Sequence, residues 1–190
     1  MGLQAGDALI IVDVQNDFCP GGALAVPEGD RVIPALNFWI AEARRLNIPI
    51  FASRDWHPAD HISFKPQGGT WPSHCVQGSP GAEFHPSLEL TPETVVINKG
   101  IQSEQDSYSA FGGTNLADRL RSMGVRRVWI AGLALDYCVK ETALDARRNG
   151  FETHLIHEAT RAVNVETDDA AAALADLRDA GVEIEGMPAA

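Results

Sequence analysis

Four side chains that could take part in catalysis stand at the ends of apolar, β-branched segments. Asp13, Asp55 and Lys99 come at the ends of the first three such segments, and Cys138 closes the turn Gly132–Cys138 after the fourth. A cysteine attacks as its thiolate, and a thiol near the start of a helix is helped by the helix dipole. Cys138 is therefore a candidate nucleophile.

A cysteine nucleophile also needs a base, and the same strand ends offer one. Asp13 could take the thiol proton and later deliver it to a leaving amine, while a cationic Lys99 would stabilise both the carboxylate and the thiolate. Backbone N–H groups in the turn before Cys138 could point at an oxyanion. Taken singly, these residues also have structural interpretations: a helix cap, a solvated strand end and a small buried hydrophobe. No histidine adjoins Cys138 in sequence, so a Cys-His pair would need a distant contact.

A second group of chemically active side chains lies in the loop from Asp55 to Pro92, which is rich in Pro, Gly, His and Ser. Asp55 and His57 are one residue apart, so both could bind one cation, and His74 could complete the set. His61 is a further possible ligand, although each histidine alone is more often an ordinary loop residue. Three protein ligands would leave coordination positions for water or substrate. Long loops are usually functional or disordered, and the aromatic residues here argue against disorder.

The elements that must position these groups alternate along the chain. Six short runs are expected to be strands: Ala8–Val14, Pro49–Ser53, Thr94–Asn98, Arg127–Ala131, Thr153–Ile156 and Val182–Ile184. The first four are apolar almost throughout, as buried parallel strands are. Between them, apolar residues at helical spacing mark four helix faces: Val32, Leu36, Trp39, Ile40 and Ala43; Leu116, Leu120 and Met123; Val139, Thr142, Ala143 and Ala146; Leu174 and Leu177.

Turn residues support the same alternation of helices and strands. Four residues that tolerate a left-handed conformation separate a helical pattern from the next strand: Asn47, Gly124, Gly150 and Gly181. Thr114 and Thr167 are expected to be N-caps. We expect one domain over residues 1–190 with an α/β/α three-layer architecture, built on a mostly parallel, doubly wound sheet of six strands with helices on both faces. The ligand site of such a fold lies beyond the carboxyl ends of the strands, where the four candidate residues converge.

Composition restricts the partners of the chain. The net charge is -11 and there is no basic run, so neither nucleic acid nor an anionic membrane is an expected partner. The longest purely aliphatic stretch, Ala8–Val12, is too short to span a bilayer, and the first residues do not resemble a signal peptide. Three cysteines without a CxxC pair suit free thiols in a reducing compartment, so we expect a cytoplasmic protein.

Five separated motifs, in order, make the chain resemble the nicotinamidase/pyrazinamidase branch of the isochorismatase-like cysteine hydrolases. The resemblance runs from Leu9 to Glu185 and is carried by these segments: Ile11-Val12-Asp13-Val14-Gln15-Asn16-Asp17-Phe18, Ser53-Arg54-Asp55-Trp56-His57-Pro58, Trp71-Pro72-Ser73-His74-Cys75-Val76, Lys99-Gly100 and Gly132-Leu133-Ala134-Leu135-Asp136-Tyr137-Cys138-Val139.

The resemblance implies roles for particular residues. Asp13, Lys99 and Cys138 would form a catalytic triad, and the N–H groups of Ala134 and Cys138 would form the oxyanion hole beside a cis Leu133–Ala134 peptide. A divalent metal would be bound by Asp55, His57 and His74, with His61 less certain because its spacing varies among relatives. Zinc is the first expectation, with manganese or iron as alternatives. The implied substrate pocket contains these residues: Phe18, Leu24, Trp71, Tyr108, Leu133 and Tyr137.

The implied reaction is hydrolysis of nicotinamide to nicotinate and ammonia through a thioester on Cys138, a step of NAD salvage, with pyrazinamide as a further substrate. The metal would position the pyridine ring rather than supply the nucleophile. Three alternatives stay open: a hydrolase that uses a metal-bound hydroxide, an amidase for another small amide such as an N-carbamoyl compound, and a catalytically silent metal or pyridine binder. The chain could act as a monomer or as a homo-oligomer.

Overall fold

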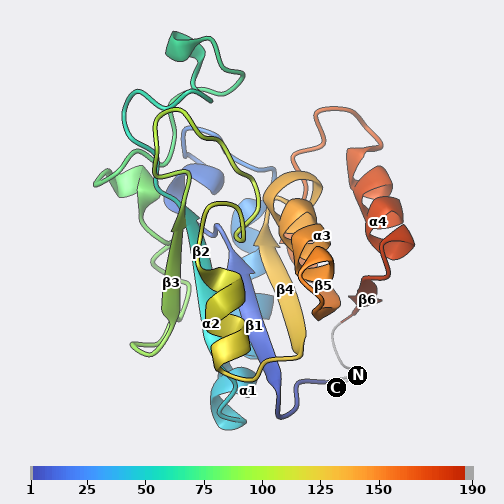
Figure 1. Cartoon of the computed structure of the whole chain (residues 1–190). Helices are drawn as coiled ribbons and strands as arrows, with labels where there is room; N and C mark the ends of the chain where they lie inside the picture. Colours follow the sequence, from blue (N-terminus) through green and yellow to red (C-terminus); the bar gives the residue numbers. More distant parts are fainter. Residues whose placement is uncertain (1, 187–190) are drawn as a thin grey trace.

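The computed structural model describes residues 2–186, and a parallel sheet is the centre of this part of the chain (Figure 1). Every pairing between its six strands is parallel. The spatial order is β3-β2-β1-β4-β5-β6. The strands are β1 Asp7–Val12, β2 Ile50–Asp55, β3 Val95–Lys99, β4 Arg127–Leu133, β5 Glu152–Arg161 and β6 Glu183–Glu185. The expected doubly wound sheet is confirmed.

Helices cover both faces of this sheet (Figure 1). The α-helices are α1 Ile33–Arg45, α2 Leu116–Ser122, α3 Lys140–Arg148 and α4 Asp169–Asp179. Short 3-10 turns are η1 Asn16–Phe18, η2 Gly29–Val32, η3 Lys65–Gln67 and η4 Pro80–Ala82, and a π-helical turn, η5, spans Leu135–Val139. Helix α1 shares one buried cluster with the sheet, and α2, α3 and α4 share the other. The architecture is therefore three-layered.

Strand β1 shows why both layers form. Its alternate residues Leu9 and Ile11 pack in the cluster with α1, whereas Ile10 and Val12 pack in the opposite cluster. Successive side chains of a strand point to opposite faces, so a strand that is apolar throughout needs cover on both sides. Fully burying one such side chain contributes roughly 1.5–3 kcal/mol.

The strand order reverses between β1 and β4, which makes this pair the topological switch point of the sheet. Gly132 of β4 is paired with Val12 of β1, and a Cβ added to this glycine would lie 2.1 Å from the Val12 carbonyl oxygen. Glycine thus permits the close approach of the two strands just before the segments that follow them diverge. Asp13 and the η5 turn begin at this point.

Helix ends follow the sequence pattern better than helix starts do. Positive φ angles are confirmed at all four residues predicted to end helices: Asn47, Gly124, Gly150 and Gly181. The predicted N-cap Thr167 is wrong, because Asp168 precedes α4 and Asn164 Oδ1 accepts a hydrogen bond from Ala170 N. Thr114 lies one residue before the N-cap of α2, although its hydroxyl accepts a hydrogen bond from Leu116 N at 3.3 Å.

No helix within residues 2–186 has the length and hydrophobicity that crossing a bilayer requires.

Candidate active site

Lys99 is the last residue of β3 and its ammonium group lies at the centre of the site. Its Nζ lies 2.9 Å from Asp13 Oδ2 and 3.5 Å from Cys138 Sγ, and it also donates a hydrogen bond to Asp55 Oδ1. Burial alone would lower the pKa of Lys99, but the two carboxylates outweigh burial and raise this pKa well above 10.5. Lys99 therefore stays cationic in a fully buried position.

Asp13 follows β1 with a left-handed backbone, φ +50°, and its carboxyl group is completely buried. Asp13 Oδ1 accepts a hydrogen bond from Ser53 Oγ at 2.7 Å. The other oxygen, Oδ2, faces Lys99 but receives no aligned hydrogen bond within residues 2–186. Burial raises the pKa of Asp13 above 3.8 and Lys99 opposes this shift. One carboxylate oxygen is thus available to accept a proton.

Cys138 lies in the η5 turn, which leads directly into α3, and its side chain borders a pocket. Burial raises the pKa of Cys138 well above 9.0; Lys99 lowers it, and the carboxylates of Asp13 and Asp55 raise it further. Burial and the two carboxylates therefore favour the neutral thiol in the resting site. Oxygens of Asp13 and Asp55 and the sulfur of Cys138 all lie within 4.8 Å of one another. The thiol proton can thus pass to a nearby carboxylate.

Asp55, His57 and His74 place three ligand atoms within 4.8 Å of one another, and all three residues are buried. Asp55 Oδ2 lies 3.5 Å from His57 Nε2 and 3.9 Å from His74 Nε2. The Nδ1 atoms of His57 and His74 lie 2.9 Å and 2.8 Å from the carbonyl oxygens of Gly100 and Pro72, which places the ring protons on Nδ1. The lone pairs of both Nε2 atoms then face the carboxylate, an arrangement that fits a bound metal ion.

Two residues outside this group hold it in place. Gln15 Nε2 donates a hydrogen bond to the carbonyl oxygen of Asp55, and Gln15 Oε1 accepts one from the N–H of Asp55. Gly100 supports the ring of His57: a Cβ at this glycine would lie 2.4 Å from His57 Cε1. The conformation of the two ligands therefore depends on Gln15 and on the missing side chain of Gly100.

His61 stacks on the His57 ring and is not part of the group formed by Asp55, His57 and His74. The two rings are stacked with centroids 4.0 Å apart. His61 Nδ1 lies 2.7 Å from Ser63 Oγ and its Nε2 lies 3.2 Å from the carbonyl oxygen of Gln105. Both ring nitrogens thus have partners within the protein, and His61 is not among the residues whose ligand atoms converge.

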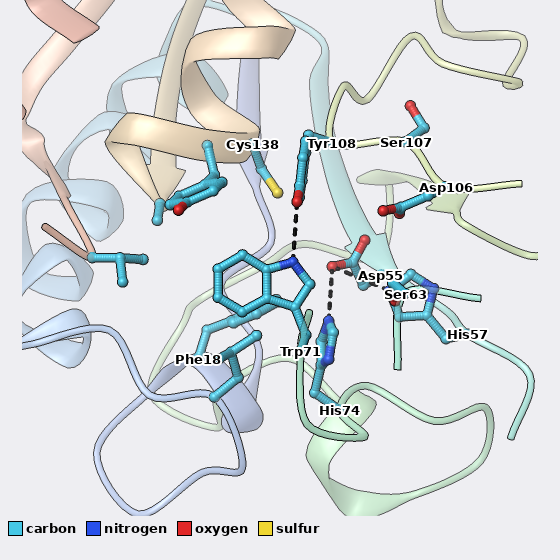
Figure 2. Close-up of a pocket in the computed structure, with 14 residues that line it drawn as sticks. Phe18, Asp55, His57, Ser63, Trp71, His74, Asp106, Ser107, Tyr108 and Cys138 are labelled. Carbon is cyan, nitrogen blue, oxygen red and sulfur yellow. Dashed lines mark hydrogen bonds and ion pairs between the residues drawn. The ribbon is translucent and has the colours of Figure 1, made fainter. Parts of the chain in front are cut away.

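A pocket opens onto Cys138 on one side and onto the Asp55 group on the other (Figure 2). Aromatic rings form its wall: Trp71 Nε1 donates a hydrogen bond to Tyr108 Oη at 3.0 Å, and both rings pack edge-on against Tyr137. Phe18 packs against the His74 ring. The pocket therefore has the shape and chemistry to hold a small flat molecule between a thiol and a metal group.

The pocket brings together most of the residues expected to bind substrate: Phe18, Leu24, Trp71, Tyr108 and Tyr137. Leu133 differs, since its side chain is completely buried in the core. The Leu133–Ala134 peptide is cis, which confirms that expectation, and Ala134 borders the pocket.

Sequence reasoning missed four pocket residues: Ser63, Asp106, Ser107 and Val163. They lie on loops whose course no periodic pattern reveals. Val163 has one indirect signal, because the buried Asp136 of the turn motif accepts hydrogen bonds from the N–H groups of Val163 and Asn164 at 2.9 and 2.8 Å. The presence of Asp136 in the turn Gly132–Cys138 could therefore have indicated that another loop is anchored beside the pocket.

Known proteins are similar to this chain in sequence and in fold. The isochorismatase domain model matches residues 7–187. The nicotinamidase/pyrazinamidase of Mycobacterium tuberculosis is 44% identical over 185 residues, covering 93% of this chain and 97% of that protein.

Solved structures agree with the sequence comparison. The pyrazinamidase of Pyrococcus horikoshii in complex with zinc superposes with a TM-score of 0.92 at 46% identity, covering 96% of this chain and 99% of the other. The L. infantum PnC1 structure in complex with nicotinate has a TM-score of 0.90 at 41% identity, covering 98% and 96%.

Proposed function

The chain belongs to the isochorismatase family, and from that premise we propose that it hydrolyses nicotinamide to nicotinate and ammonia with Cys138 as the nucleophile. The central observation is the position of Lys99, which contacts Asp13, Cys138 and Asp55 at once. A nucleophile group and a metal-binding group thereby open onto the same pocket. Relatives that are named nicotinamidases at this identity support the choice of substrate.

The first half of the reaction forms a thioester. Asp13 Oδ2 accepts the proton of the Cys138 thiol, and the sulfur attacks the carboxamide carbon. The N–H groups of Ala134 and Cys138 stabilise the negative charge that develops on the oxygen. As the C–N bond breaks, Asp13 returns the proton to the nitrogen, which leaves as ammonia. The positive charge of Lys99 stabilises the Asp13 carboxylate and the Cys138 thiolate in this buried site.

The second half releases the acid. Asp13, again a carboxylate, takes a proton from water, whose oxygen attacks the thioester carbon. The C–S bond breaks and the proton passes to the sulfur, which restores the neutral thiol. The nicotinic acid formed loses its carboxyl proton to solvent and leaves as nicotinate. The pKa of Asp13, which burial raises above 3.8, makes the protonated form easier to reach and so supports its use as base and then as acid.

We further propose that Asp55, His57 and His74 bind a divalent metal, with zinc as the first candidate and manganese or iron(II) as alternatives. When bound, the metal supplies a positive centre that orients the pyridine ring in the pocket. The zinc complex of the Pyrococcus horikoshii relative supports this proposal. The flat aromatic wall suits pyrazinamide as well, and we propose it as a second substrate.

The test is ammonia release from nicotinamide by the wild type and by Cys138→Ala. We expect the variant to lose turnover, and turnover at the wild-type rate would overturn the assignment of the nucleophile. Cys19→Ala is the matched control, since Cys19 is also a buried free thiol but does not border the pocket.

Two rival functions make different predictions. If a metal-bound hydroxide were the nucleophile, chelation would abolish single-turnover chemistry even at saturating substrate, whereas a metal that positions substrate chiefly affects binding. An N-carbamoyl amidase would prefer an N-carbamoyl compound in the same ammonia assay; an N-carbamoylsarcosine amidase from Thermoplasma acidophilum shares the fold at only 26% identity. A silent binder would turn over none of these amides.

A further inference from the structure

A second group of ligand atoms lies on the sheet away from the pocket, between β5 and β6. His154 of β5 is paired with Glu183 of β6, and Glu185 stands two residues further along the same strand. Alternate residues of a strand share a face, so all three side chains lie on one side of the sheet. The His154 ring is completely buried and stacks on Trp129, with centroids 4.5 Å apart at 12°.

The spacing of these atoms resembles that of the Asp55 group. His154 Nδ1 lies 3.1 Å from Glu185 Oε1 and 3.9 Å from Glu183 Oε2, and the three ligand atoms all lie within 4.8 Å of one another. The corresponding separations around Asp55 are 3.5 and 3.9 Å. Ligands about 2.1 Å from a tetrahedral ion are separated by comparable distances.

Glu152 determines which ring nitrogen is available. His154 Nε2 lies 3.2 Å from Glu152 Oε1, on the opposite edge of the ring from the other two carboxylates. A neutral ring that donates its Nε2 proton to Glu152 directs the Nδ1 lone pair at Glu183 and Glu185. A histidine held by a carboxylate in this way is the usual arrangement around a bound metal.

Three electron-pair donors therefore converge on one point, an arrangement that a cation between them would stabilise. Glu183 is largely exposed, with 61% of its side chain accessible, which leaves an entry path and open coordination positions. We propose that His154, Glu183 and Glu185 bind a second divalent ion of the transition series, for which one imidazole and two carboxylates are suitable ligands.

Such an ion would link the edge strand β6 to β5. Strand β6 has only three residues and pairs with β5 alone, so a cross-link between their side chains would stabilise this edge of the sheet. An ion that binds only the folded chain raises the melting temperature, and the rise grows with the ratio of free ion concentration to its dissociation constant. The inference is independent of the proposed amide hydrolysis.

The test is calorimetric titration of metal-stripped protein with Zn²⁺, with Mg²⁺ as a comparison that should not bind to the imidazole. We expect two equivalents of Zn²⁺ for the wild type and for Glu89→Gln/Glu93→Gln, a control pair that removes the same charge from exposed positions. Glu183→Gln/Glu185→Gln should bind one equivalent, and His74→Gln should lose the other. Only the His74→Gln variant should lose amidase activity.

Because the double variant changes a terminal strand, Glu183→Gln alone provides a second test at an exposed side chain. We expect its dissociation constant for the second Zn²⁺ to rise at least tenfold. We also expect Zn²⁺ to raise Tm less in Glu183→Gln/Glu185→Gln, which keeps one site, than in the wild type. A wild type that binds one equivalent, or a double variant that still binds two, would overturn the proposal.

Discussion

Lys99 donates a hydrogen bond to Asp55, so the lysine that contacts the thiol of Cys138 is also bonded to a member of the proposed metal-binding group. Both partners are buried, and Asp13 shares the same ammonium group. A single cation thus compensates two carboxylates on neighbouring strands. We therefore expect both catalysis and stability to depend on this charge.

Lys99→Met should show both effects. Removing the ammonium leaves two uncompensated buried carboxylates, so we expect the free energy of unfolding to fall by about 3–5 kcal/mol. We expect kcat/KM for nicotinamide to fall by roughly 10³-fold or more, as when one member of a triad is lost. Urea denaturation and steady-state kinetics measure the two quantities.

Lys140→Met is the matched control, because Lys140 pairs with the exposed Asp176 at the surface. Its loss should change the stability by less than about 1 kcal/mol. A Lys99→Met protein as stable as this control would contradict the central role of the buried charge.

Gly100→Ala tests the support of His57. The added Cβ would overlap the His57 ring, and Gly100 also has a positive φ of 60°. We expect Zn²⁺ affinity to fall roughly 10–100-fold, the usual effect of disturbing the residues that orient a ligand. Gly124→Ala is the matched control. Gly124 also has a positive φ, 71°, but a Cβ added there would have no atom within 4 Å. If both variants bound zinc equally well, the proposed support would be wrong.

Gln15→Ala tests whether the Asp55 backbone must be clamped. The substitution removes the two hydrogen bonds that hold the amide of Asp55, but leaves all three ligands in the chain. We expect weaker zinc binding in a chelator competition assay, and recovery of most of kcat at saturating zinc. Gln77→Ala, which removes an exposed hydrogen bond to the Trp56 carbonyl oxygen, should leave the affinity unchanged. Equal affinities for the two variants would rule out the clamp.

The pH dependence of kcat/KM should reflect Asp13. Asp13 acts as a base only when ionised, and burial raises its pKa, so activity is lost as pH falls through a value above 3.8. The hydrogen bond from Ser53 lowers this pKa. Ser53→Ala should therefore move the acid limb of the pH profile to higher pH, whereas Ser122→Ala, at an exposed position of α2, should not. A limb that stays in place or moves to lower pH in Ser53→Ala would argue against Asp13 as the base.

The sheet could be predicted from sequence because its strands are buried on both faces, and continuous apolar runs such as Leu9–Val12 carry that signal. The convergence of Asp13, Asp55, Lys99 and Cys138 followed from topology alone, since parallel strands end at one edge. The protonation states of these four side chains could not be predicted from topology. The neutral thiol of Cys138 results from burial beside two carboxylates, which only the packed structure reveals.

Contacts made by loops were beyond sequence reasoning. Spacing among relatives ranked His61 below His74, but nothing in the sequence shows that the His61 nitrogens bond to Ser63 and Gln105 while His74 Nε2 faces Asp55. The choice depends on how the loop folds back on β2. Likewise, Val163 joins the pocket only because Asp136 binds the loop in which Val163 lies.

The most direct test of the central claim is mass spectrometry of enzyme mixed with nicotinamide and quenched in acid during turnover. If Cys138 is the nucleophile, the peptide that contains Cys138 carries a nicotinoyl group in the wild type and none in Cys138→Ala, which also releases no ammonia. A wild type that turns over without any acylated Cys138, together with a Cys138→Ala variant that still releases ammonia, would contradict the account.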